Sequence, residues 1–251
     1  MKAMIFAAGL GTRLKPITDE KPKALVEVAG VTLLERVITR LDKAGFNDIT
    51  INVHHQGQKI IDFLYQKDNF GLDIHISDER SQLLDTGGGI LKARKWLDGD
   101  APFLVHNVDI LTDFELANFY QHHLASGAIA TVMVKQRLTE RYLLFDRDLR
   151  MRGWANKATG ERRPADVKER YDLLYALAFG GLHMMSPSIF PLLEQYANGR
   201  EVFPIIPFYI DICEKQKILA YPQSSSYHWF DVGKIRTLQE ADEWYSMRSP
   251  T

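Results

Sequence analysis

Short apolar runs alternate with amphipathic segments over the first half of the chain. Residues 2–7 form an apolar run that ends at a glycine-rich loop, which is typical of a buried parallel strand. Residues 33–41 carry apolar side chains at helical spacing, and Gly45 stands just beyond the expected helix end. By the same criteria the sequence predicts further strands at 48–53, 72–76, 102–105 and 129–134, and helices at 56–65, 90–97 and 114–124.

This alternation predicts an α/β fold with a doubly wound, mostly parallel, Rossmann-like sheet that is flanked by helices. Right-handed crossovers between parallel strands place ligand sites at the carboxyl ends of the strands. We therefore expect the functional residues in the loops that follow strands, at 7–15, 77–89 and 106–113.

The pattern changes after residue 135. Residues 142–145 and 151–154 predict short antiparallel strands, whereas 155–170 is polar, highly charged and aperiodic, and so predicts an exposed loop. Whether this loop forms a lid stays open. No repeat or linker divides the chain, so we expect one domain over residues 1–251. The remaining apolar patterns predict strands at 173–185, 219–221 and 227–232, a short helix after 186–188, and helices at 204–213 and 235–245.

Composition and charge narrow the possible functions. Of 251 residues, 45% are hydrophobic and 25% charged, which is typical of a globular protein. The formal net charge of −1 argues against a nucleic-acid partner, and a single cysteine, Cys213, excludes a disulfide framework. The N-terminal segment lacks the pattern of a signal peptide, and no apolar stretch approaches the ~20 residues of a membrane span. We therefore expect a cytoplasmic protein with no membrane partner.

The most informative motif follows the first predicted strand. Gly9 and Gly11 let the backbone approach a ligand closely with its N–H groups pointing inward, and Thr12 adds a hydroxyl donor. Arg13 and Lys23 are suited to phosphate oxygens. Because the third glycine of a dinucleotide fingerprint is missing and no P-loop motif is present, the sequence argues against a dinucleotide-dependent oxidoreductase.

Four ordered motifs resemble those of the sugar-1-phosphate nucleotidyltransferases. The stretch GLGTRLKPIT and the following KPKALVEVAGVTLLER resemble the signature of that family. Three later segments resemble further family motifs: LDTGGGI at 84–90, HNVD at 106–109 and WFDVGK at 229–234. In the second of these, Val108 stands where the family usually has glycine.

The resemblance implies a Mg²⁺-dependent reaction between a nucleoside triphosphate and a sugar 1-phosphate, which gives a nucleotide-sugar and pyrophosphate. It also implies a nucleotide-binding half at 1–135 and a sugar-binding half with a C-terminal helix at 136–251. Uridylyl transfer to N-acetylmuramic acid 1-phosphate or a related sugar is favoured. Guanylyl transfer to mannose or heptose 1-phosphate and cytidylyl transfer to phosphocholine stay open. A non-catalytic nucleotide-sugar-binding regulatory subunit is the alternative of another class, and the resemblance leaves a monomer and a homodimer equally open.

The resemblance further assigns site residues. Arg13 and Lys23 are expected to be catalytic, and Asp109 and Asp231 are expected to offer Mg²⁺ the hard oxygen ligands it prefers. Expected nucleotide-binding residues are Ala8, Gly9, Gly11, Thr12, Gln82, Asp85, Gly87 and Gly88, and expected sugar-binding residues are Asn107, Gly180 and Gly181.

Two smaller expectations concern residues near these motifs. Asp113 is expected to cap the helix that follows it, which leaves Asp109 for the metal. The family's E-K-P segment, whose lysine contacts the sugar phosphate, is not found, and Lys168 is considered as a replacement.

Overall fold

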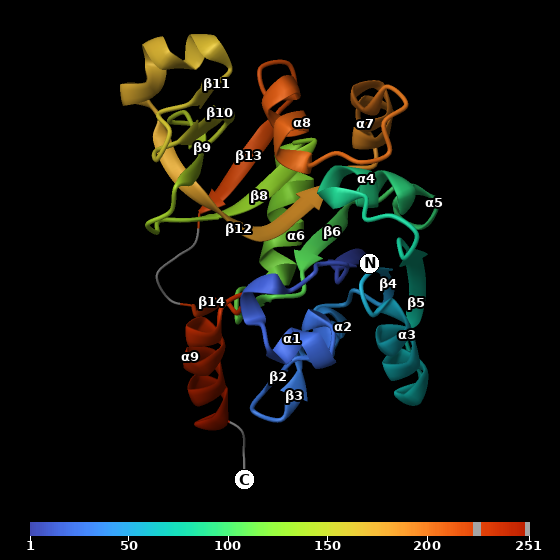
Figure 1. The fold of residues 1–251 in the computed structure, drawn as a ribbon. Helices are drawn as coiled ribbons and strands as arrows, with labels where there is room; N and C mark the ends of the chain where they lie inside the picture. The colour runs from blue at the N-terminus through green and yellow to red at the C-terminus, as the bar shows by residue number, and fades with distance from the viewer. Residues whose placement is uncertain (223–226, 249–251) are drawn as a thin grey trace.

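A mixed sheet with a parallel core organises the protein (Figure 1). The computed structural model describes residues 1–222 and 227–248, without the side chains of residues 166, 168–170 and 222. Four neighbouring strands form the parallel core in the order β6-β1-β4-β5, with bounds Phe103–Asn107, Lys2–Phe6, Asp48–Val53 and Asp73–Asp78. The strands predicted from the apolar runs of the first hundred residues are thus confirmed.

Antiparallel strands extend this core on one side. β12 (Tyr175–Met185) lies between β6 and β8 (Ala130–Lys135) and runs antiparallel to both. The expected α/β sheet with a parallel core and flanking helices is confirmed. Beyond β6 most pairings are antiparallel, because β12, from the second half of the chain, separates two strands of the predicted alternation. The first part of β12 also pairs with β9 (Arg141–Phe145), which continues to β10 (Met151–Asn156) and β11 (Arg162–Arg163), while β13 (Ile218–Pro222) pairs with β8.

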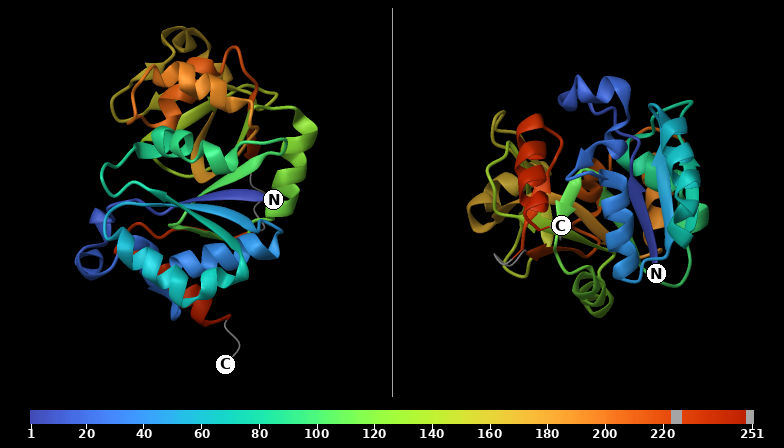
Figure 2. Two further views of the ribbon diagram at one scale, coloured as in Figure 1. Left: turned by 90° about the vertical axis from the view of Figure 1, so that its right-hand side faces the viewer. Right: turned by 90° about the horizontal axis from the view of Figure 1, so that it is seen from below.

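Helices cover both faces of the sheet (Figure 2). Side chains of β1 alternate between two core clusters, with Ala3 and Ile5 in one and Met4 in the other, as expected for a strand buried on both faces. The first cluster includes apolar residues of α2 (Leu33–Lys43), α3 (Gly57–Gln66), α6 (Leu116–Ser126) and α9 (Ile235–Ser246). The second includes those of α4 (Asp85–Lys92), α5 (Arg94–Leu97), α7 (Ile189–Ala197) and α8 (Ile205–Ile212). Among the described residues, no helix has both the length and the apolar character needed to cross a membrane.

Residues 155–170 differ from the expected exposed, aperiodic loop. The segment contains the end of β10, the short strand β11 and the start of the 3₁₀ segment η4 (Ala165–Leu173). Val167 is fully buried and joins a small core cluster with Leu144 and Ala155. That apolar anchor ties the segment to the sheet. The side chain of Lys168 lies outside the described residues.

Two small ribbons and several short helices complete the fold. β7 (Ile110–Thr112) pairs with β14 (Trp229–Asp231), which brings the C-terminal motif next to the loop after β6. The other ribbon joins β2 (Glu27–Val28) to β3 (Val31–Thr32). The short helices are α1 (Ile17–Glu20) and the 3₁₀ turns η1 (Thr12–Leu14), η2 (Lys23–Leu25) and η3 (Asp68–Gly71).

Asp113 holds the C-terminal strand instead of capping a helix. Its carboxylate accepts a hydrogen bond from the His228 backbone N–H at 2.6 Å and lies 2.9 Å from Nδ1 of the His228 ring. Helix α6 begins at Leu116, and no side chain caps it. The predicted capping role is therefore wrong, because the pairing of β14 with β7 places a better partner beside Asp113.

The three consecutive glycines lie inside helix α4, although the pattern predicted a helix beginning at Ile90. A Cβ atom added to Gly88 would lie 2.0 Å from the carbonyl oxygen of Glu201, and one added to Gly87 would lie 2.4 Å from the Phe203 ring. The glycines therefore let the 201–203 segment pack directly on the helix.

A substitution at Gly88 tests this packing. Gly88→Ala is expected to lower the free energy of unfolding by about 1–3 kcal/mol, because the new methyl group would displace a backbone carbonyl. Thermal unfolding followed by circular dichroism measures the change, at about 2–4 °C per kcal/mol for a chain of this size. Gly9→Ala is the matched control, since a Cβ there meets nothing within 4 Å. Equal unfolding midpoints for the two variants would contradict the packing role of Gly88.

Candidate functional site

The loop after β1 is the first component of the site. Gly11 has a φ of +65°, and a Cβ there would lie 2.8 Å from Cγ2 of Thr18, so this position requires glycine. The Thr18 hydroxyl donates to the Gly11 carbonyl at 2.9 Å and fixes the turn. Within the described part of the chain, the N–H groups of residues 9–12 donate to no acceptor. The loop therefore presents a row of free backbone donors, which is the arrangement that binds anions.

A buried asparagine supports this loop from below. Oδ1 of Asn52, near the end of β4, accepts hydrogen bonds from the N–H groups of Ala7 at 2.8 Å and Ala8 at 3.2 Å. Nδ2 of Asn52 donates to Oε1 of Glu79 at 2.8 Å. The amide N–H of Ala8, an expected nucleotide-binding residue, is thus satisfied within the protein.

Glu79 connects this support to a second loop. Its side chain is fully buried, and its Oε2 accepts a hydrogen bond from the N–H of Leu84 at 3.1 Å. A Cβ on Gly89 would lie 3.0 Å from Oε1 of Glu79, so α4 approaches the carboxylate closely. Asn52 and Glu79 therefore fix the loop after β1 relative to the loop before α4.

An ion pair between Lys23 and Asp109 lies beside the glycine loop. Nζ of Lys23 contacts Oδ2 of Asp109, and the two side chains are 12% and 16% exposed. Lys23 lies against the loop, since a Cβ on Gly11 would be 3.2 Å from Cβ of Lys23. Asp109 follows β6, at the same edge of the sheet as the loop after β1. The Lys23 ammonium and the Asp109 carboxylate are thus mostly shielded from water beside the loop after β1.

Arg13 and Asp231 meet at Gly233. A Cβ on Gly233 would lie 2.7 Å from Nη2 of Arg13 and 2.9 Å from Oδ1 of Asp231, so the glycine leaves room for both groups. Oδ1 of Asp231 accepts a hydrogen bond from the Gly233 N–H at 3.1 Å. Val232 donates its N–H to the Asp109 carbonyl at 2.9 Å, which joins the two aspartate-bearing segments. Two cations and two carboxylates from distant parts of the sequence are therefore gathered at one edge of the sheet.

A cavity of about 460 Å³ opens between these loops. Six residues predicted for the site line it, namely Ala8, Gly9, Lys23, Asp85, Asn107 and Asp109. The other lining residues are Phe6, Ala7, Asn52, Leu83, Thr86, Val108 and Val202. This volume is within the range of small-molecule sites in proteins.

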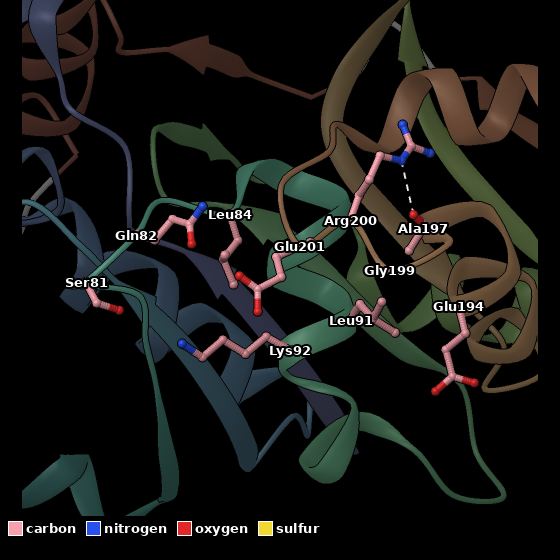
Figure 3. Close-up of a pocket in the computed structure, with 11 residues that line it drawn as sticks. Ser81, Gln82, Leu84, Leu91, Lys92, Glu194, Ala197, Gly199, Arg200 and Glu201 are labelled. Atoms are coloured by element: carbon pink, nitrogen blue, oxygen red, sulfur yellow. Dashed lines mark hydrogen bonds between the residues drawn. The ribbon is translucent and has the colours of Figure 1, made fainter.

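Gln82 and Gly88 line a different cavity from Ala8, Gly9 and Asp85, the predicted nucleotide-binding residues beside Asp109. This second cavity, of about 590 Å³, is bordered by α4 and the end of α7, and Figure 3 shows its lining side chains. Gln82 shares it with Gly88, Lys92, Arg200 and Glu201, whereas Asp85 and Thr86 line the cavity beside Asp109. The first turn of α4 therefore stands between the two spaces.

Backbone amides in the first half of α4 donate hydrogen bonds to another segment of the chain. The N–H groups of Gly87 and Gly88 donate to the carbonyl of Phe203 at 2.9 Å and 3.1 Å, and both glycines are buried. The Thr86 hydroxyl accepts a hydrogen bond from the Ile205 N–H at 2.9 Å. The amides of Gly87 and Gly88, two of the expected nucleotide-binding residues, therefore bind the protein's own backbone in the structure.

Of the predicted sugar-binding residues, Asn107 lines the cavity, whereas Gly180 and Gly181 lie in β12 beside it. Gly181 has a φ of +86°, and a Cβ there would be 2.5 Å from Cγ1 of Ile110 and 3.4 Å from Nδ2 of Asn107. The carbonyl of Gly180 accepts a hydrogen bond from Nε1 of Trp229 at 2.9 Å. The irregular part of β12 is thus packed against the loop after β6 and against the C-terminal motif.

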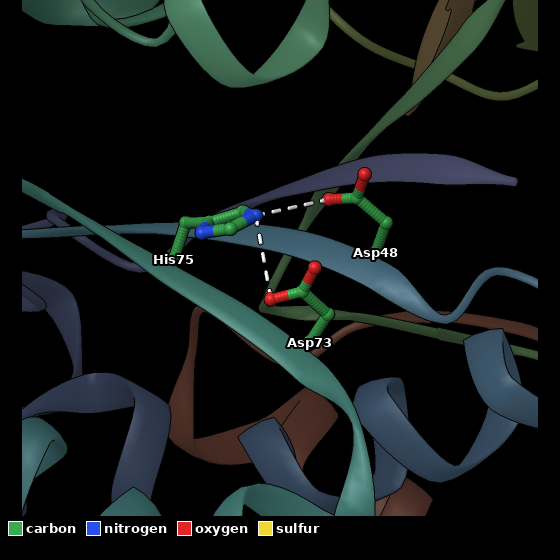
Figure 4. Close-up of side chains that lie close together, drawn as sticks. All are labelled: Asp48, Asp73 and His75. Atoms are coloured by element: carbon green, nitrogen blue, oxygen red, sulfur yellow. Dashed lines mark ion pairs between the residues drawn. The ribbon is translucent and has the colours of Figure 1, made fainter.

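Two groups of residues have the chemistry of a cation site. Within the part of the chain that the structure describes, Oδ1 of Asp109 and Oδ2 of Asp231 accept no hydrogen bond, so each carboxylate keeps an oxygen for a hard cation. The second group is Asp48, Asp73 and His75, whose ligand atoms lie within 4.8 Å of one another (Figure 4). It lies at the amino ends of β4 and β5, opposite to the cavity, and the Asp73 side chain is 70% exposed. Asp109 and Asp231 therefore keep free carboxylate oxygens beside the loop after β1, whereas the second group lies at the opposite edge of the sheet.

Sequence reasoning missed Asn52 and Glu79. Asn52 falls in a strand that was correctly predicted, and a polar residue within its apolar pattern was the available signal. Glu79 follows the next strand, inside the loop range that was expected to carry functional residues. Their partnership joins residues 27 positions apart and follows from the parallel pairing of β4 with β5.

The sequence is similar to that of known proteins. The family model described as nucleotidyl transferase matches residues 2–247. The chain is 45% identical over 121 residues to the N-acetylmuramate alpha-1-phosphate uridylyltransferase of Neisseria meningitidis, an alignment that covers 48% of this chain and 52% of the relative. It is 28% identical over 241 residues to the mannose-1-phosphate guanyltransferase of Candida albicans, which covers 93% of this chain and 61% of that relative.

The fold also matches solved structures. The UDP-glucose pyrophosphorylase from Acinetobacter baumanii superposes with a TM-score of 0.78 at 21% identity, over 100% of this chain and 94% of that one. This likeness shows the same arrangement of a parallel core with flanking helices. Because the family model extends from the first strand into the last helix, the chain belongs to the nucleotidyl transferase family.

Proposed function

We propose that the protein transfers a nucleotidyl group from a nucleoside triphosphate to a sugar 1-phosphate. An oxygen of the sugar phosphate attacks the α-phosphorus, a new P–O bond forms, and the bond to the leaving pyrophosphate breaks. The observation that carries the proposal is the ion pair of Lys23 with Asp109, which lies between a loop of free N–H donors and a cavity of suitable size.

The charges of the two substrates explain why the site needs Lys23 and Arg13. Like charges ~4 Å apart repel each other by about 4 kcal/mol at an effective dielectric of ~20, and both substrates are polyanions. Lys23 would stabilise the charge that shifts at the α-phosphate, and Arg13 would hold the triphosphate tail and the departing pyrophosphate. Catalysis would then consist mainly of positioning and charge stabilisation.

Asp109 and Asp231 would hold Mg²⁺. The free oxygen on each carboxylate and the hard-oxygen character of both ligands fit this ion. When bound, the ion supplies Lewis-acid polarisation and neutralises phosphate charge. The ion pair with Lys23 orients the Asp109 carboxylate.

Uridylyl transfer to N-acetylmuramic acid 1-phosphate is the favoured reaction. The support is the 45% identity to the uridylyltransferase of Neisseria meningitidis, although that alignment spans about half of each protein. The alternative is guanylyl transfer to mannose or heptose 1-phosphate, which the longer but weaker similarity to the guanyltransferase of Candida albicans favours. A non-catalytic binding subunit is disfavoured, because binding alone does not require both cations and both carboxylates.

A substrate panel tests the proposed reaction. Pyrophosphate release with Mg²⁺ is measured for UTP, GTP, CTP, dTTP and ATP, each combined with sugar 1-phosphates and phosphocholine. We expect UTP with N-acetylmuramic acid 1-phosphate to be turned over fastest. A folded protein that binds a triphosphate but turns over no pair would favour the regulatory-subunit alternative.

Replacing Lys23 tests its catalytic role. Lys23→Ala is expected to lower kcat about 100-fold or more, with a smaller effect on triphosphate affinity, because the charge acts where the transition state gains charge. Lys21→Ala is the matched control, since Lys21 is a half-exposed neighbour that pairs with Glu27 at 3.4 Å. Steady-state kinetics and calorimetric titration of the triphosphate separate the two effects. A pure loss of affinity in Lys23→Ala would remove Lys23 from the transition-state role.

Replacing Asp109 tests the metal assignment. Asp109→Asn is expected to abolish turnover at millimolar Mg²⁺ while the protein stays folded, because the amide loses the charge that holds the cation. Asp73→Asn is the control, because it alters the cluster at the opposite edge of the sheet. Turnover is measured across a range of Mg²⁺ concentrations for both variants. If Asp73→Asn raised the Mg²⁺ requirement and Asp109→Asn did not, the assignment would be reversed.

A further inference from the structure

Two cations share the indole ring of Trp229. Nζ of Lys135 lies 5.0 Å from the ring centroid, and Cζ of Arg137 lies 5.2 Å from it. The ring itself is held by the hydrogen bond from its Nε1 to the carbonyl of Gly180 at 2.9 Å. Cation–π contacts with a tryptophan stabilise each charge, but they do not remove the repulsion between two charges on one ring.

Neither cation has an anionic partner among the described residues. Arg137 donates through Nη2 to the carbonyl of Phe179 at 3.5 Å, and within the described part of the chain its buried Nε atom has no acceptor. Burial and the neighbouring charge of Arg137 lower the pKa of Lys135. By contrast with these two cations, Arg152 on strand β10 pairs with two carboxylates, at 2.7 Å and 3.3 Å. An anion placed between Lys135 and Arg137 would satisfy the free donors and relieve the repulsion.

The segment that carries Arg137 is held in place before any ligand binds. The Tyr142 hydroxyl accepts a hydrogen bond from the Thr139 N–H at 3.1 Å and donates to the carbonyl of Arg137 at 3.2 Å. Tyr142 is itself buried in β9. An anion would therefore meet a preorganised pair and would not need to order a flexible loop.

The pair lies on the side of the site where a sugar is expected. Trp229 and Asp231 are two residues apart on β14, so their side chains leave the same face of the ribbon, ~7 Å apart along the strand. Gly180, which accepts the indole hydrogen bond, is followed by Gly181, and Gly181 packs against Asn107. Asn107 lines the cavity that also contains Lys23 and Asp109. A contact path thus links the two cations to the cavity.

We propose that Lys135 and Arg137 bind an oxyanion of the acceptor substrate, either its phosphate or a carboxylate carried on the sugar. This inference rests on the proposed function. If the bound anion is a carboxylate, the acceptor is an acidic sugar 1-phosphate. If it is the phosphate, the pair holds the group that every sugar 1-phosphate carries. The guanidinium supplies paired donors for two oxygens of the anion, and the ammonium supplies a point charge. Trp229 fixes both cations relative to Asp231.

Calorimetric titration with two matched acceptors tests this inference. N-acetylmuramic acid 1-phosphate and N-acetylglucosamine 1-phosphate differ by one carboxylate-bearing ether group. Lys135→Met and Arg137→Gln are each expected to raise the acceptor Kd about tenfold and to leave the Kd of UTP unchanged, whereas Arg137→Lys should recover part of the affinity. Lys95→Met is the control, because Lys95 lies over the ring of Trp96 at 4.0 Å in a separate cation–tryptophan pair on helix α5.

The pattern of losses identifies the anion. Equal losses for both acceptors assign the pair to the phosphate, and a loss confined to the muramic acid derivative assigns it to the carboxylate. Unchanged acceptor affinity in both variants, or an equal rise in the Kd of UTP, would overturn the inference. The proposed function fails in a different way, namely when the unmodified protein binds these ligands and releases no pyrophosphate in the substrate panel.

Discussion

The contact of Asn52 with Glu79 is the constraint on which the geometry of the site depends. One buried amide accepts from the backbone of the loop after β1 and donates to a fully buried carboxylate, which in turn accepts from the loop before α4. Burying an ionised or polar group without partners costs several kcal/mol, so each group is stable only while the others stay in place. The two loops that border the cavity are therefore fixed as a unit by the sheet beneath them.

Because Asn52 binds only part of the loop after β1, the backbone amides of this loop fall into two groups. The N–H groups of Ala7 and Ala8 anchor the loop, whereas those of residues 9–12 donate to no acceptor among the residues that the structure describes. Gly11 makes the change of direction possible, and Thr18 holds it. Because the donors are held in place before binding, an anion bound there would not have to order the loop, and little affinity would be lost to conformational entropy.

Much of the fold could be predicted from periodicity, because the parallel core consists of buried apolar strands that alternate with amphipathic helices. The insertion of β12 between β6 and β8 could not, since strand order depends on contacts between residues up to about 80 positions apart, as between His106 and Leu182. The role of Asp113 was mispredicted for the same reason. Local sequence suggested a helix cap, and the partner that decides its role, His228, is 115 residues away.

The sequence predicted the position of the candidate site better than the role of each residue in it. The motifs predicted that Lys23, Asp109 and the glycine loop lie at one edge of the sheet, because the carboxyl ends of neighbouring parallel strands meet there. The structure places them at that edge. Motifs could not say which glycines face a ligand and which face the protein. Gly87 and Gly88 resemble a binding segment, yet their amides bind the carbonyl of Phe203, and a side chain at Gly88 would collide with the 201–203 segment.

In the proposed reaction, this packing would limit which groups of the segment can contact the nucleotide base. With the amides of Gly87 and Gly88 occupied, the polar groups of this segment that border the cavity belong to Asp85 and Thr86. The Thr86 hydroxyl already accepts from Ile205, and Asp85 Oδ1 accepts from the Thr86 N–H at 2.6 Å, so Oδ2 of Asp85 is the acceptor that stays free among the described contacts. A free carboxylate oxygen favours a ligand edge that donates hydrogen bonds, such as the imide N–H of uracil or the amide N–H of guanine. The discrimination between these two bases would then depend on the shape of the cavity beside Leu83 and Val202 and not on the glycines that define the motif.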